Sequence, residues 1–266
     1  MDLRRSARSH PGGRIDSRGR HQYRYHPAWR AAQQEHKFDR IVHLATALPA
    51  ARARVTRDLR QSADGRAQML AAAFRFLDDA APRVGSVAYL EEYGSRGLTT
   101  LQQRDATVDG HRVLLRFPAK SHQTDVMHMT DADLSAVVAD LLTGDAQERL
   151  LRYRLGDTAH HLHEAEVNDY IRDTTGDHFT AKDFRTLRGT IVAAQTLAHA
   201  GEAATQHARH AAEVEAAKAA SEALQKTPAV AKSAYIDPRV FEAYGEGRLL
   251  DLSISPDTAL RRLVQE

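Results

Sequence analysis

The segment from Phe179 to Thr190 constrains the fold most, because it joins a helix start signal to a long apolar face. Thr180 and Asp183 have the spacing of a capping box, in which the two residues satisfy each other's backbone groups at a helix start. Apolar residues then recur at intervals of three and four: Phe184, Leu187, Ile191, Ala194 and Ala198. The pattern predicts a helix over residues 180–199 with one face in a core.

Three cations fall in the first turns of this predicted helix, namely Lys182, Arg185 and Arg188. The unpaired N–H groups and the positive end of the dipole at a helix start favour an anion. Because cations lie at the same place, the pattern predicts that a phosphate group binds there. From these residues alone, an ordinary solvated helix start is the preferred interpretation.

Composition places the chain among globular proteins. Of the 266 residues, 42% are hydrophobic, which is enough for a sizeable core. The absence of cysteine excludes disulfides and thiolate metal sites, and the sequence gives no reason to expect a metal or another cofactor. No apolar run has the length of a membrane span, so we expect a soluble, cytoplasmic protein without a membrane partner.

Charge is distributed unevenly along the chain. Residues 1–60 hold 14 Arg and Lys against 5 Asp and Glu, whereas the remainder holds 23 against 30. A basic segment of this kind is typical of contact with a polyanion. Arginine outnumbers lysine 31 to 6, so each lysine that is kept invites a specific explanation.

The fold expected from the pattern is α+β and mostly α. Residues 1–20 are rich in Arg, Gly and Ser and are expected to be loosely held. Asp109-Gly110 predicts a hairpin turn within a small antiparallel sheet of three strands. The strands are expected within 98–108, 112–117 and 126–129. Helical spacing is found over 27–48, 49–78, 131–142, 163–174, 180–199, 202–225, 237–246 and 257–265, with Pro49 separating the first two.

Several strings resemble one family in the same order along the chain. AKDFRT at 181–186 resembles the "AK-x-F/L-RT" segment of the catalytic domain of type IB DNA topoisomerases. The residues from Pro82 to Ser121 resemble the pattern "R-x-G … G-L-x-T-L … F-x-GK-S", and TPAVAKSAYIDP at 227–238 resembles the segment that carries the nucleophilic tyrosine. The resemblance implies a helical catalytic domain with a small antiparallel sheet, the fold that this family shares with tyrosine recombinases.

The resemblance also implies a set of catalytic residues. Arg83, Lys120, Arg185 and Tyr235 occupy the positions of the two arginines, the lysine and the nucleophile. Lys226 stands where the family has His or Asn, nine positions before the tyrosine. Leu187 and Ala119 also depart from the family, which has an aromatic residue and glycine there.

These residue types suit the cleavage of a phosphodiester. A tyrosine hydroxyl supplies the attacking oxygen, and guanidinium groups neutralise charge on the non-bridging oxygens. A lysine with a lowered pKa can donate the proton that the leaving 5′ oxygen needs, which an arginine does poorly. Because cationic side chains take the place that Mg²⁺ has in other enzymes, the expected reaction needs neither metal nor ATP.

The N-terminal part resembles a DNA-binding segment of the same family. Residues 16–26 resemble "D-x-x-GR-x-QY-x-Y", which implies that Gln22, Tyr23 and Tyr25 contact DNA. The family has several strands ahead of this segment, so we expect an incomplete N-terminal sheet. The expected domains are a basic remnant of a DNA-binding domain at 1–60 and a catalytic domain at 61–266.

The function implied is relaxation of supercoiled double-stranded DNA through a 3′-phosphotyrosyl intermediate. The enzyme would be a monomeric isomerase in the cytoplasm, associated with the nucleoid of a bacterium, with Lys182 and Arg188 as further DNA contacts. Two alternatives stay open at this point. One is a DNA-binding protein of the same fold with weak or lost cleavage, and the other is a tyrosine recombinase. Recombinases generally have His-x-x-Arg where this chain has Lys182-x-x-Arg185.

Overall fold

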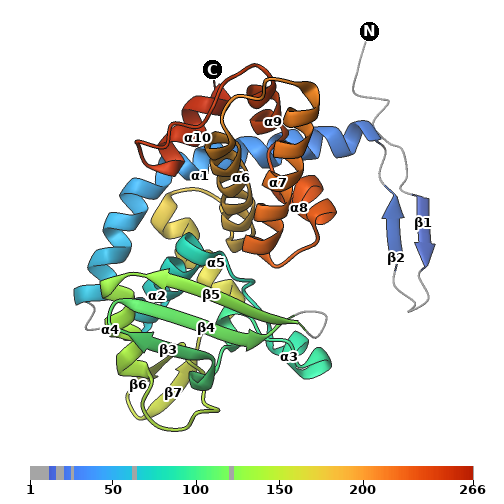
Figure 1. Ribbon diagram of the computed structural model, residues 1–266. Coiled ribbons are helices and arrows are strands. Elements are labelled where there is room, and N and C mark those ends of the chain that lie inside the picture. The colour runs from blue at the N-terminus through green and yellow to red at the C-terminus, as the bar shows by residue number, and fades with distance from the viewer. Residues whose placement is uncertain (1–11, 16–20, 25–26, 62–64, 120–122, 266) are drawn as a thin grey trace. The chain divides into compact units, whose positions relative to one another are not determined.

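The computed structural model describes residues 12–15, 21–24, 27–61, 65–119 and 123–265 (Figure 1). Its residues cluster into two compact units, Met1–Arg40 and Ile41–Glu266. The expected division into a DNA-binding segment at 1–60 and a catalytic segment at 61–266 concerns function and stays a prediction.

In the first unit, strands β1 (Gly12–Ile15) and β2 (His21–Arg24) form an antiparallel pair with Gly13 opposite Tyr23. The expectation that residues 1–20 are loosely held is therefore wrong for the four residues of β1. Helix α1 (Pro27–Gln61) follows and runs through Pro49 without a break. The predicted break there is wrong because Leu44, Leu48 and Val55 are fully buried while the proline is exposed, so packing overrides the local preference.

The predicted three-stranded sheet is confirmed. It has the order β3 (Ala106–Asp109), β4 (Arg112–Pro118) and β5 (Thr124–Thr130), all antiparallel. Asp109 pairs with Arg112 across the turn, and Gly110 has a φ of 56°, which a side chain would disfavour. The strand expected from residue 98 begins only at 106, since residues 98–100 and 103–105 form 3₁₀ turns η1 and η2.

The helix expected over 49–78 is wrong in its start, because α1 continues to Gln61 and α2 (Gly65–Ala80) follows it. The other predicted helices are present close to their expected bounds: α4 (Ala132–Leu141), α5 (Glu164–Thr175), α6 (Ala181–Ala200), α7 (Gln206–Leu224), α9 (Pro238–Gly245) and α10 (Pro256–Gln265). The sequence did not predict α3 (Val87–Tyr93), α8 (Pro228–Tyr235) or the hairpin of β6 (Arg152–Leu155) and β7 (Thr158–His161). These elements have at most eight residues each, too few for a clear apolar period.

Helix α6 is the centre of the helical part of the second unit. It packs against α7, α8, α9 and α10 on one side and against α2 and α5 on the other (Figure 1). Twelve of its residues are buried, among them Phe184, Leu187 and Ile191 of the predicted apolar face. None of the described helices has the length and apolar character that a membrane span requires.

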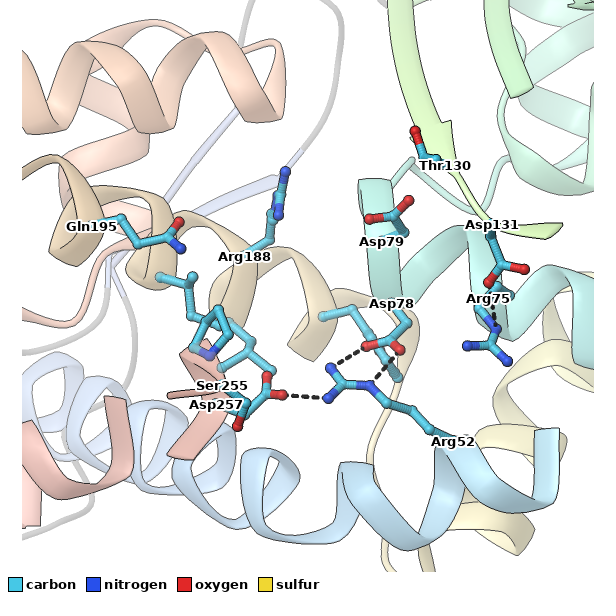
Figure 2. Close-up of a pocket in the computed structure, with 14 residues that line it drawn as sticks. Arg52, Arg75, Asp78, Asp79, Thr130, Asp131, Arg188, Gln195, Ser255 and Asp257 are labelled. Atoms are coloured by element: carbon cyan, nitrogen blue, oxygen red, sulfur yellow. Dashed lines mark hydrogen bonds and ion pairs between the residues drawn. The ribbon is translucent and has the colours of Figure 1, made fainter. Parts of the chain in front are cut away.

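An ion-pair network ties the C-terminal helix to the core. Arg52 of α1 donates from Nε and Nη2 to the Asp78 carboxylate of α2 at 2.7 and 2.9 Å. Its Nη1 also donates to Asp257 of α10, whose side chain is only 6% exposed (Figure 2). One guanidinium therefore joins the consecutive helices α1 and α2 to α10, which lies far away in the sequence.

The Arg52→Ala substitution should destabilise the fold by about 2–3 kcal/mol, because it leaves two poorly exposed carboxylates without their cation. Urea unfolding followed by circular dichroism measures this loss. As a control, Arg172→Ala removes an exposed pair with Asp169 and should cost under about 1 kcal/mol. Equal losses for the two variants would contradict the role given to Arg52.

Candidate active site

Side chains of the protein accept hydrogen bonds from N–H groups at the start of α6. The Asp183 carboxylate accepts from the backbone N–H of Thr180 at 2.8 Å and from its hydroxyl at 2.9 Å, which confirms the predicted capping box. The N–H of Ala181 donates to the Asn168 side chain at 3.1 Å. The expectation that these N–H groups and their neighbouring cations form one phosphate site is therefore wrong. At least two N–H groups already have acceptors, and the three cations point to different surroundings.

The three cations of α6 are neighbours along the helix surface, but they differ in burial. Lys182 is exposed, Arg185 is 5% exposed, and Arg188 is half-buried. Arg188 lines a cavity of about 320 Å³ between α2, α6 and α10, where its charge interacts with Asp79 (Figure 2). Arg185 is not among the residues that line this cavity. DNA contact by Lys182 and Arg188 stays a prediction.

Arg185 joins three segments of the chain. Its Nη1 donates to the carbonyl of Ala81 at the end of α2, and its Nη2 donates to the carbonyl of Leu224 at the end of α7 at 2.7 Å. Its guanidinium carbon lies 5.5 Å from the ring centroid of Tyr235, within the range of a cation–π contact. The Nε atom is buried and has no hydrogen-bond partner among the described residues.

Burial lowers the pKa of Arg185, and the nearby charge of Arg83 lowers it further. Tyr235 and Asp125 act in the opposite direction, Tyr235 partly through a hydrogen bond. Since an arginine titrates far above neutrality, the group stays cationic at any working pH. It is a fixed positive charge beside a phenol.

Tyr235 is the last residue of α8, and hydrogen bonds at both ends of this helix hold it in place. Thr227 caps the start of α8 by accepting from the N–H of Val230 at 3.4 Å, and Pro228 occupies the first turn, where a missing N–H costs nothing. At the other end, the hydroxyl of Thr190 bonds the Tyr235 carbonyl at 3.2 Å and accepts from the N–H of Asp237 at 3.1 Å. Tyr235 therefore lies at a fixed junction between α8 and α9.

Gly189 allows α6 to approach this junction closely. A Cβ atom added at this position would lie 2.8 Å from the carbonyl oxygen of Tyr235, 3.1 Å from its Cβ and 2.8 Å from a methyl group of Leu224. Real side chains do not reach such distances from a backbone oxygen. Any larger residue must push Tyr235 away from α6 and so away from Arg185.

Arg83 approaches the cluster from the segment after α2. Its carbonyl accepts from the N–H of Leu98 at 2.8 Å, and Gly97 lies so close that an added Cβ would stand 2.6 Å from this oxygen. The side chain extends to Asp125 of β5, with 3.7 Å between Nη1 and Oδ2, and donates to the carbonyl of Gln225 at 3.4 Å. Arg83 thus meets the same end of α7 as Arg185.

Asp125 and Lys226 complete the charged cluster. Asp125 is 3% exposed; burial raises the pKa of its carboxyl, while the charges of Arg83, Arg185 and Lys226 oppose that rise. Lys226 follows Gln225, whose left-handed φ of 51° ends α7. The structure therefore brings four of the five predicted catalytic residues into one electrostatic neighbourhood: Arg83, Arg185, Tyr235 and Lys226.

A cleft of about 290 Å³ adjoins the cluster. Its lining includes Arg83, Lys226 and Arg96, together with Tyr89 on α3, which is 38% exposed. Lys120, the fifth predicted catalytic residue, lies outside the described residues. The strands on either side of it are well anchored, since the N–H of Ala119 donates to the carbonyl of Gln123 at 2.7 Å.

The geometry of the charged cluster does not test the predicted DNA contacts of the first unit, which stay predictions. Gln22 and Tyr23 lie in strand β2, and Tyr25 lies outside the described residues. Sequence reasoning missed Asp125, Gly189 and Thr190. Only Asp125 leaves a signal in the sequence. It stands two positions before Met127 in β5, and residues two apart in a strand lie on the same face, which is buried here.

Comparison with known proteins decides the family. The family model of the eukaryotic DNA topoisomerase I catalytic core matches residues 26–246. The chain belongs to the type IB DNA topoisomerase family. It is also 24% identical over 237 residues to DNA topoisomerase 1B of Acanthamoeba polyphaga mimivirus, covering 86% of this chain and 70% of the viral protein.

Membership of the type IB topoisomerase family confirms the expected fold and the expected class of enzyme, an isomerase that acts on DNA. The relative is a viral protein, so the expected bacterial source receives no support from it.

Substituting Gly189→Ala should destabilise the protein by about 1–3 kcal/mol and slow any reaction of Tyr235, because the new methyl group displaces the α8–α9 junction. Thermal unfolding and a DNA cleavage assay measure the two effects. Gly65→Ala serves as the control, since a Cβ there meets its nearest atom at an ordinary 3.5 Å. A Gly189→Ala protein as stable and active as Gly65→Ala would contradict the close approach.

Proposed function

We propose that this topoisomerase relaxes supercoiled double-stranded DNA by transient cleavage of one strand at Tyr235. The observation that carries the proposal is the contact of the buried Arg185 guanidinium with the Tyr235 ring, beside Arg83. A phenol next to two fixed cations has the composition that attack on a phosphate anion requires.

In the proposed reaction, the Tyr235 oxygen attacks the phosphorus of a backbone linkage. The phenol loses its proton to water, the bond from phosphorus to the 5′ oxygen breaks, and the 5′ oxygen takes a proton from the Lys120 ammonium. The products are a 3′-phosphotyrosyl linkage and a free 5′-hydroxyl. Reversal of the same steps restores the strand, so the energy of the diester is kept and no ATP is needed.

The arginines have separate tasks in this scheme. Arg83 is partly exposed and lines the cleft, so it can bind a non-bridging phosphate oxygen directly. Arg185 holds the ends of α2 and α7 against Tyr235, and its unpaired Nε has the donor that a phosphate oxygen would satisfy. The Lys226 ammonium contributes a further hydrogen-bond donor at the position where the family has His or Asn.

The partners of the reaction follow from the same scheme. Gln22, Tyr23, Tyr25, Lys182 and Arg188 are proposed to contact the duplex. A monomer suffices, because the proposed catalytic groups all come from one chain. We propose a cytoplasmic, nucleoid-associated location, because supercoiled DNA is found there.

Relaxation of a negatively supercoiled plasmid tests the function. The protein should relax the plasmid in EDTA without ATP, and Tyr235→Phe should abolish relaxation because no nucleophile remains. Tyr244→Phe, which removes a phenol from α9 outside the cluster, should retain activity within about twofold. Relaxation by the Tyr235→Phe protein would refute the assignment, and failure of the unsubstituted protein would favour a DNA-binding protein that has lost cleavage.

Arg185→Lys tests the clamp separately from the charge. Lysine keeps the charge but lacks the fork that reaches two carbonyls, so the rate of strand cleavage should fall by about a hundred- to a thousandfold. A single-turnover assay on a short duplex measures this rate. Arg75→Lys, a change at another poorly exposed arginine that the cluster does not include, should change the rate only severalfold. Similar rates for the two variants would be the contradicting result.

A further inference from the structure

Asp125 is a carboxylate inside the cationic cluster, and the proposed reaction gives it no task. It lies on β5 opposite Phe117 of β4, on the face that also buries Met127 and Met129. Strands seldom place an acid on such a face, because an ionised carboxylate is costly to bury unless it is paired. Its presence there calls for a cationic partner.

The partners of Asp125 are the groups proposed to bind phosphate. Its Oδ2 lies 3.7 Å from Nη1 of Arg83, and its charge also interacts with Arg185 and Lys226. Its Oδ1 is buried and has no hydrogen-bond partner among the described residues. The carboxylate therefore faces three cations while only part of its bonding capacity is used.

Lys226 makes this negative charge more important. The resembling family has His or Asn at this position, so lysine adds a full positive charge to a site that already holds two arginines. Like charges held close together repel, and the repulsion is stronger where water is excluded. A neighbouring carboxylate offsets part of this repulsion when no phosphate is bound.

We propose that Asp125 is a positioning residue that holds Arg83 in its reactive place and balances the charge of Lys226. The proposal rests on the function proposed above. It implies that Asp125 competes with the DNA phosphate for the same cations. The carboxylate then weakens binding of the duplex while it keeps Arg83 aligned for cleavage.

A purely structural role for Asp125 predicts something different. Loss of a structural residue would weaken binding and slow cleavage together, because both depend on a folded site. Loss of a competing, positioning carboxylate should instead tighten binding and slow cleavage. The opposite signs of the two effects distinguish the roles.

The binding arm uses the Tyr235→Phe protein, which cannot cleave. Adding Asp125→Asn should tighten binding of a short duplex by about three- to tenfold at low salt, with a smaller gain at high salt because salt screens the charge that was removed. Adding Lys226→Asn as well should return the affinity to within about twofold of the Tyr235→Phe parent. Fluorescence anisotropy measures all three affinities.

The cleavage arm uses proteins with Tyr235 intact. Single-turnover cleavage should slow by about tenfold or more in Asp125→Asn, since Arg83 loses its ion pair. Asp125→Glu keeps the charge on a longer stem, so it should slow cleavage while leaving the affinity near that of the parent. Asp257→Asn removes a buried carboxylate outside the cluster and should change neither the affinity nor the rate, whatever its effect on stability.

The two proposals fail in different ways. Absence of any covalent adduct in the unsubstituted protein would defeat the proposed function, and the binding arm would still decide the role of Asp125. Equal or weaker duplex binding after Asp125→Asn would overturn the proposal for Asp125, even with strand cleavage intact. If Asp125→Asn does not fold, Asp125→Glu decides: tighter binding or unchanged cleavage would overturn the proposal.

Discussion

The site depends on one buried guanidinium. Arg185 spans the carbonyls at the ends of α2 and α7 and lies against the ring of Tyr235, so three segments that are distant in the sequence meet at one side chain. Burying such a charge is costly unless its donors are satisfied, and here two carbonyl oxygens supply part of that compensation. Of its other N–H donors, the one on Nε is buried and has no acceptor among the described residues, which fits a site completed by a phosphate.

Charge and packing act together around this guanidinium. Gly189 and Thr190 of α6 fix the backbone at Tyr235, while Arg83 and Asp125 approach from the segment after α2 and from β5. Arg185, Tyr235 and Asp125 thus lie on α6, α8 and β5, and side chains on such rigid elements are held more closely than side chains on loops. The negative charge of Asp125 offsets part of the positive charge of Arg83, Arg185 and Lys226.

The sequence was informative where a pattern is local and long. The capping box of α6, the Asp109-Gly110 hairpin and the long α7 were predicted from such patterns and are confirmed. The short helices α3 and α8 and the continuous helix through Pro49 depend on tertiary packing, which no local pattern records.

The candidate site was predicted from the resemblance rather than from residue chemistry alone. An arginine on an amphipathic helix carries no mark that it will be buried against a tyrosine fifty positions later, because that contact is made by chain topology. Asp125 leaves one signal, a carboxylate at a buried position of a strand, but that signal does not say which cations lie beside it. Its meaning comes only from the three cations that the fold brings around it.

Mass spectrometry of the trapped complex tests the central claim most directly. The protein is denatured during reaction with a nicked or suicide duplex, the DNA is trimmed with nuclease, and the chain is cut with trypsin. The peptide of residues 233–239 contains a single tyrosine, Tyr235. The account predicts a nucleotide attached through its 3′-phosphate to that tyrosine and its loss in Arg185→Lys at early times. A nucleotide attached at another residue, or full labelling of Tyr235 in the Arg185→Lys protein at the same times, would contradict it.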